Sequence, residues 1–167
     1  DFLTLFSSLF IAYEVLDIAR GGRFYFPLEE FNTYVLIHAC VSFVGVLWFW
    51  IRLRHYTYRK PFWFELKEII RTLLILFIIE LAIVAFSRLY VSRYFWSVTW
   101  ICIFVGLPLS RIFVKNLLIK SGMYLKETII IGNGKNAKEV FNALNNESYL
   151  GFDIKLFVTT EDYHSEF

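Results

Sequence analysis

The sequence has few of the residues that mark a disulfide framework, a metal site or a nucleic-acid surface. Its two cysteines, Cys40 and Cys102, stand in apolar runs without a CxxC motif or a ligand spacing to histidine, so we expect buried free thiols and no metal site. The net charge of +2 is too small to indicate nucleic acid as a partner. The first apolar run lacks the basic start and the cleavage site of a signal peptide.

Apolar residues are in large excess. The chain is 57% hydrophobic and 20% aromatic, whereas a soluble domain has about 45–50% apolar residues. A membrane-spanning helix takes roughly 20 residues, and four apolar runs approach that length: 2–19, 34–51, 69–86 and 94–113. We therefore expect an α-helical membrane domain with four transmembrane helices. The first run carries Glu14 and Asp17, which we place on a solvated rim.

The distribution of basic residues predicts the orientation. Two regions are rich in them, the connection between the second and third runs and the stretch after the fourth, whereas the other two connections have only Arg20 with Arg23, and Arg88 with Arg93. Because basic loops stay inside, we expect both termini in the cytoplasm. Aromatic residues suggest the two interfaces. The inner set is Trp48, Trp50, Tyr56, Tyr58 and Trp63, and the outer set is Tyr90, Tyr94, Phe95 and Trp96.

The composition changes after Lys115. We expect the membrane domain to cover residues 1–115, a cytoplasmic linker 116–127, and the start of a Rossmann-like, CoA-binding-like domain 128–167. The last region begins with an apolar strand at 128–131, continues with an amphipathic helix at about 136–145 and reaches a second strand at 153–158. Two strands and one helix predict the first β-α-β unit of a Rossmann-like α/β domain. We expect the domain to continue beyond Phe167.

A glycine-rich turn joins the predicted strand and helix. Gly132 and Gly134 open a GxGxxA pattern, and glycines there allow a phosphate to approach a helix N-terminus. A dinucleotide site also needs an acid at the end of the second strand, and only Glu161 or Asp162 could serve. Gly132 and Gly134 are therefore candidate nucleotide-loop residues, and a ligand-free structural or regulatory module is the alternative.

Glu80 is an ionisable residue near the middle of the third run. A charge at that depth is costly unless it is paired or faces the bundle interior. His38 in the second run is the nearest candidate partner. We favour an interhelical hydrogen bond that fixes packing over proton or ion transport, because one acid does not make a relay.

The segment between the second and third runs alternates cations with aromatic residues. Its candidate contacts to a lipid phosphate, or to another domain of the same protein, are Arg52, Arg54, Arg59 and Lys60. Arginine suits bidentate phosphate binding, and the rings suit the membrane interface. An ordinary positive-inside loop is the alternative.

Three stretches together resemble a known family: WFWIRLRHYTYRKPFWFELKEI, KETIIIGNGKNAKEVFNAL and LGFDIKLFV. The chain resembles the N-terminal portion of the large bacterial polyprenyl-phosphate phosphoglycosyl transferases, of the undecaprenyl-phosphate galactose phosphotransferase type. In that family a membrane domain and a Rossmann-like module precede a catalytic domain. That domain uses Mg²⁺ and an Asp-Glu dyad to join a sugar 1-phosphate from a UDP-sugar to undecaprenyl phosphate.

The resemblance implies a membrane anchor and a regulatory or dimerisation front end for an enzyme that initiates O-antigen or related lipopolysaccharide synthesis. The implied partners are inner-membrane lipids, undecaprenyl phosphate, the catalytic domain of the same polypeptide and a second copy of the chain. The family's catalytic motifs are not in this sequence, so no residue here is assigned a catalytic role. The first alternative is the N-terminal region of a membrane-bound, NAD-dependent nucleotide-sugar dehydratase. The second is a channel or transporter with a nucleotide-sensing domain, which the lack of a filter sequence disfavours.

Overall fold

The computed structural model describes residues 1–20, 28–87, 91–132 and 134–158. Five residues used in the sequence predictions lie outside the described residues: Arg23, Arg88, Tyr90, Glu161 and Asp162. The chain forms two compact units. The first comprises Asp1–Tyr58 and Trp63–Ile112, and the second comprises Arg59–Phe62 and Phe113–Phe167.

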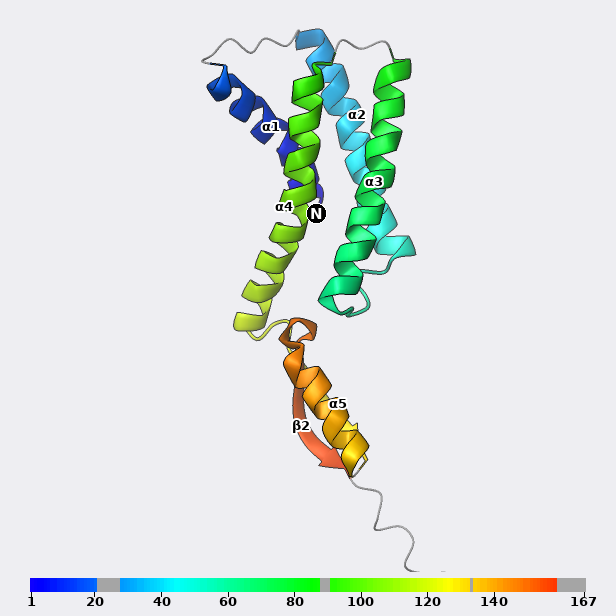
Figure 1. The fold of residues 1–167 in the computed structure, drawn as a ribbon, viewed down its shortest axis with the longest axis vertical. Helices are drawn as coiled ribbons and strands as arrows, with labels where there is room; N and C mark the ends of the chain where they lie inside the picture. The colour runs from blue at the N-terminus through cyan, green and yellow to red at the C-terminus, as the bar shows by residue number, and fades with distance from the viewer. Residues whose placement is uncertain (21–27, 88–90, 133, 159–167) are drawn as a thin grey trace, which may run out of the picture. The chain divides into compact units, whose positions relative to one another are not determined.

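Four long helices dominate the chain (Figure 1). They are α1 (Phe2–Ala19), α2 (Leu28–Leu47), which continues into a π-helical turn η1 (Trp48–Arg52), α3 (Phe62–Phe86) and α4 (Arg93–Lys120). Each is long and apolar enough to cross a membrane, in agreement with the four helices predicted. Helices α3 and α4 are longer than the predicted apolar runs of 69–86 and 94–113. Their additional turns contain charged residues such as Glu65 and Lys115, which an apolar run does not include.

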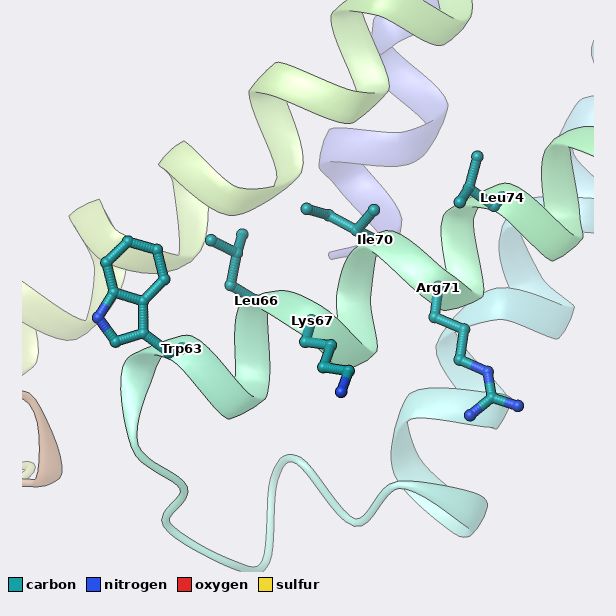
Figure 2. Close-up of a pocket in the computed structure, with 6 residues that line it drawn as sticks. All are labelled: Trp63, Leu66, Lys67, Ile70, Arg71 and Leu74. Atoms are coloured by element: carbon teal, nitrogen blue, oxygen red, sulfur yellow. The ribbon is translucent and has the colours of Figure 1, made fainter.

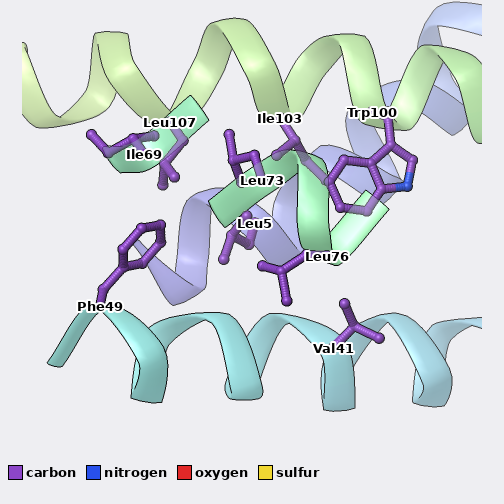
Figure 3. Close-up of a cluster of buried hydrophobic side chains, with 9 residues drawn as sticks. All are labelled: Leu5, Val41, Phe49, Ile69, Leu73, Leu76, Trp100, Ile103 and Leu107. Atoms are coloured by element: carbon purple, nitrogen blue, oxygen red, sulfur yellow. The ribbon is translucent and has the colours of Figure 1, made fainter. Parts of the chain in front are cut away.

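All four helices contribute to one core (Figure 3). The core consists of Leu5, Val41, Phe49, Ile69, Leu73, Leu76, Trp100, Ile103 and Leu107. Leu5 comes from α1, Val41 from α2 and Leu73 from α3. Trp100 comes from α4. Side chains of this kind interlock at the density of a protein interior, so the first unit has a packed centre that holds its helices together.

A second cluster joins α1, α2 and α4. It consists of Leu9, Ala12, Leu16, Tyr34 and Phe95. The prediction that Phe95 marks the outer interface is wrong, because its ring is fully buried and packs 5.7 Å from the ring of Tyr34. Tyr94, one residue earlier on the helix, is exposed as an interface residue would be.

The outer surface of the helices is apolar. Side chains such as Leu36, Ile78 and Ile101 are each more than 60% exposed, which fits helices solvated by lipid rather than by water. Cys40 shares this surface and Cys102 is partly exposed. The prediction of buried thiols is therefore wrong for Cys40. The thiol lies in an apolar stretch of sequence, but on the outer apolar surface of the helices and not in the protein core.

The second unit contains two parallel strands linked through a helix. Strand β1 (Lys126–Ile131) leads to α5 (Lys135–Asn146), a short 3-10 turn η2 (Ser148–Leu150) and β2 (Phe152–Val158). The register runs from Lys126 opposite Phe152 to Ile131 opposite Val158, with one irregularity between Thr128 and Ile129. The parallel pairing and the intervening helix were both predicted from the sequence.

Helix α5 covers this small sheet with one face. Ala137 is buried, and the ring centre of Phe141 lies 5.5 Å from the ring centre of Phe157 on β2. Leu144 is half-buried, whereas Val140, predicted on the same face, is largely exposed. The apolar stripe is therefore narrower than the sequence pattern suggested.

Candidate functional site

The segment from Trp48 to Pro61 carries the cations predicted to bind phosphate. It leaves α2 through the π-helical turn η1, and the chain then reverses at Arg54, whose φ is +52°. The aromatic side chains Trp48, Trp50, Tyr56 and Tyr58 are all about half exposed. Exposed rings at a helix end suit a membrane interface.

Two of the four predicted cations lie in the first unit. Arg52 is exposed at the end of η1. The Arg54 guanidinium lies 5.7 Å from the ring centre of Tyr58, and its Nη1 donates a hydrogen bond of 3.4 Å to the Tyr58 hydroxyl. Both side chains are accessible, as a phosphate contact requires.

The other two, Arg59 and Lys60, belong to the second unit. Arg59 Nη1 donates to the carbonyl oxygens of Leu150 at 2.9 Å and Gly151 at 2.6 Å, and its Nη2 donates to that of Tyr124 at 2.7 Å. Its guanidinium also lies 4.4 Å from the ring centre of Tyr124. Three donors are thus committed to backbone carbonyls next to β1 and β2, so Arg59 holds the second unit together.

The glycine turn has the backbone geometry that the pattern predicted. Gly132 and Gly134 have φ values of +136° and +92°, which disfavour other residues. A Cβ at either position would meet no atom within 4 Å. Gly134 is the N-cap of α5. The described residues therefore leave room beside the Cα atoms of both glycines, and nucleotide binding stays a prediction.

A buried charge cluster in the first unit was not predicted from the sequence. Its centre is Arg111 on α4, which is 8% exposed. Nε and Nη2 bind the two carboxylate oxygens of Asp1 at 2.9 and 2.6 Å, and Nη1 binds Glu65 at 2.9 Å. The guanidinium also stacks 4.5 Å from the ring centre of Phe49. This fork geometry is the strong form of an arginine–carboxylate contact.

His55 completes this cluster. Arg111 Nη1 lies 2.5 Å from His55 Nδ1, and His55 Nε2 lies 2.7 Å from a carboxylate oxygen of Glu68. Because arginine only donates and a carboxylate accepts, Nδ1 must be the acceptor and Nε2 must carry the proton. The contacts therefore select one neutral tautomer of His55.

This neutral tautomer agrees with the direction in which the pKa of His55 is shifted. Burial lowers the pKa of the imidazole below its ordinary value, and the Arg111 charge lowers it further against the opposing hydrogen bond to Glu68. A neutral buried histidine binds fewer protons in the folded than in the unfolded state between the two pKa values, so its contribution to stability rises with pH there.

We expect the first unit to lose stability on acidification through His55. The contribution is complete above the ordinary histidine pKa of about 6.5 and is lost as pH falls through the lower folded-state pKa. Thermal unfolding in detergent between pH 8 and pH 5 should show a steeper decline for the wild type than for His55→Gln. Parallel declines would contradict this assignment.

A second buried polar cluster lies within the membrane-spanning part. Tyr34 donates to Glu80 at 2.7 Å, and His38 Nδ1 lies 3.1 Å from the Glu80 carboxylate. His38 Nε2 lies 3.0 Å from the carbonyl oxygen of Leu5, to which it must donate. The predicted His38–Glu80 interhelical contact is thus confirmed, and it links α1, α2 and α3.

These clusters do not form a metal site. Among the residues that the structure describes, no group of three or more His, Cys, Asp and Glu side chains could hold a metal ion. The Mg²⁺ implied by the family resemblance therefore finds no fitting ligand set in the described part of this chain.

The chain has close relatives among known proteins. It is 52% identical over 97% of its length to a Haemophilus influenzae protein named an uncharacterized sugar transferase. It is 43% identical over 98% of its length to an undecaprenyl-phosphate galactose phosphotransferase of Salmonella typhimurium. It is also 47% identical over 78% of its length to a UDP-galactose-lipid carrier transferase of Erwinia amylovora. No protein-family model matches the chain.

The relatives are much longer than the chain. The matched regions cover 35%, 34% and 28% of these three proteins respectively. Identity above 40% that runs through both units shows common descent and not merely shared apolar composition. The chain is thus homologous, over about a third of their length, to these bacterial proteins named as sugar transferases.

Proposed function

We propose that the chain is the membrane anchor and regulatory or dimerisation front end of an enzyme that transfers a sugar 1-phosphate from a UDP-sugar to undecaprenyl phosphate. The observation that carries this proposal is the 43% identity, over 98% of the chain, to a protein named for that lipid carrier. A second relative is named for UDP-galactose and a lipid carrier. Galactose 1-phosphate is therefore the transferred group we favour.

The structure supports an anchoring role through its four candidate spans. The substrate named for the relative carries a long hydrocarbon chain, so an enzyme that uses it must work at a bilayer surface. We propose that the chain lies in the bacterial inner membrane with both termini in the cytoplasm, where UDP-sugars are made. The product would initiate O-antigen or related polysaccharide synthesis.

The second unit is proposed as the opening of a Rossmann-like module. Its parallel strands, helix crossover and open glycine turn support this proposal. Several apolar side chains of its two strands are exposed, and two of them, Ile131 and Leu156, are at least 60% exposed. Further structure would cover them, in line with a domain of which 128–167 is the first part.

In the proposed net reaction, a phosphate oxygen of undecaprenyl phosphate becomes bonded to the sugar-bearing phosphorus of the UDP-sugar. One P–O bond forms, the bond to the bridging oxygen of UMP breaks, and UMP leaves. Positioning of lipid and enzyme is the contribution we assign to this chain. Catalytic groups and Mg²⁺ ligands would come from the rest of the enzyme.

The test compares the full-length protein that contains this chain with residues 1–167 alone. Membranes with the whole protein, UDP-galactose, Mg²⁺ and undecaprenyl phosphate should release UMP in equal amount to a lipid-linked galactose phosphate. The isolated region should release none. UMP release by the isolated region would refute the front-end role. Failure of the whole protein with UDP-galactose, UDP-glucose and UDP-N-acetylglucosamine would refute the transferase.

A further inference from the structure

An open hollow of about 440 Å³ lies along one side of α3 in the first unit. Six residues line it: Trp63, Leu66, Lys67, Ile70, Arg71 and Leu74. Figure 2 shows the apolar side chains along the helix, with the charged ends of Lys67 and Arg71 projecting away from the backbone on another side of it. The surface thus combines an apolar strip with two cations one helical turn apart.

The two cations have no partner among the described residues. Neither Lys67 nor Arg71 makes a hydrogen bond or an ion pair with any residue that the structure describes, and both are exposed. The neighbouring acids are engaged elsewhere: Glu65 binds Arg111, and Glu68 binds His55. Helix α3 therefore directs Glu65 and Glu68 to the buried cluster and leaves Lys67 and Arg71 exposed.

This arrangement has a cost that a bound anion would lower. Like charges four residues apart on a helix repel each other. Arg71 also falls within the 18-residue apolar run 69–86, where an unpaired guanidinium is costly. A phosphate between Lys67 and Arg71 would offset both costs, because it would bridge the two cations and neutralise the charge at the membrane surface.

We propose that this face of α3 binds the phosphate and first isoprene units of a polyprenyl monophosphate. The phosphate lies between Lys67 and Arg71, and the hydrocarbon chain follows Leu66, Ile70 and Leu74, with Trp63 at the interface. A phosphate monoester carries about −1.5 to −2 charges at neutral pH, which matches two cations. A phospholipid phosphodiester carries one. The choice of a polyprenyl chain rests on the proposed function, whereas the cation pair and apolar strip stand independently of it.

The test uses the whole protein in nanodiscs of zwitterionic phospholipid. The probe is a polyprenyl phosphate with a diazirine in its first isoprene units, and mass spectrometry locates the label. We expect labelled peptides from residues 63–74. Labelling there should fall at least tenfold in the double variant Lys67→Gln/Arg71→Gln. It should be retained in Lys67→Arg/Arg71→Lys, which keeps both charges. Lys138→Gln, an exposed cation on α5, is the matched control and should label like the wild type.

Competition identifies the ligand. Unlabelled undecaprenyl phosphate should displace the probe at concentrations at least tenfold lower than phosphatidylglycerol or undecaprenol does. The proposal would be overturned if phosphatidylglycerol displaced the probe equally well, if the label appeared only in other segments, or if the double variant were labelled as strongly as the wild type. It would also be overturned if a second copy of the chain occupied residues 63–74. Galactose transfer is measured in the same nanodiscs. If the probe labels α3 but no galactose is transferred, only the proposed function is refuted. If galactose is transferred but the probe does not label α3, only this inference is refuted.

Discussion

Replacement of Arg111 by methionine is expected to lower the free energy of unfolding of the first unit by about 3–5 kcal/mol. This is the usual cost of removing one partner from a buried ion pair, because the remaining charge stays buried without compensation. Here two carboxylates, Asp1 and Glu65, would lose their cation, and His55 would lose a donor. Methionine preserves most of the aliphatic stem, so the loss reports on charge rather than volume.

The measurement is reversible unfolding in mixed micelles by titration with sodium dodecyl sulfate. Arg52→Met is the matched control, because Arg52 is exposed at the end of η1 and should change the unfolding free energy little. Adding Glu65→Gln to Arg111→Met should recover part of the loss, since one of the unpaired buried charges is removed. Equal stability of Arg111→Met and Arg52→Met would show that the buried cluster contributes nothing.

Replacement of Glu80 by leucine is expected to cost about 2 kcal/mol. The Tyr34 hydroxyl and His38 Nδ1 would both lose their partner, and a buried polar group left unpaired costs about 1–3 kcal/mol. Hydrogen bonds between membrane helices average only about 0.6 kcal/mol, so the expected loss comes mainly from the stranded groups. The same titration in mixed micelles measures it.

Glutamine at position 80 separates hydrogen bonding from charge. Its oxygen can accept from Tyr34, and its amide can donate to His38 Nδ1 while Nε2 still donates to Leu5. We expect Glu80→Gln to keep most of the stability that Glu80→Leu loses. Ile78→Leu, at an exposed position two residues earlier, controls for substitutions on the same helix. A leucine variant more stable than the wild type would mean that the polar cluster is retained for a reason other than stability.

The sequence predicts those features that follow from solvent and local pattern. Four spans follow from hydropathy, and the Glu80–His38 contact follows because an ionisable group inside a span needs a partner. The parallel strands follow from two apolar runs separated by an amphipathic helix and a glycine turn. Phe95 was misplaced because an aromatic residue near a span end can face either the lipid or the bundle, and composition does not distinguish them.

The Arg111 cluster and the Arg59 contacts could not be predicted in the same way. A cation at the edge of a span is what the positive-inside rule leads one to expect, so Arg111 gave no sign of burial. Its partner Glu65 lies 46 residues earlier in the chain. The partners of Arg59 are backbone carbonyls, which every residue has and which leave no trace in a sequence.

The carbonyl contacts of Arg59 also affect how the protein can be assembled. The second unit is discontinuous along the chain, because Arg59–Phe62 belongs to it although two long helices intervene before Phe113. The hydrogen bond from Arg59 to Gly151 closes a loop over 92 residues, so during synthesis it forms only after α3 and α4 have been made. Completion of the unit beside the first residues of β1 and β2 therefore waits for the last two spans. A fragment beginning at residue 116 would lack the side chain that ties its strands together.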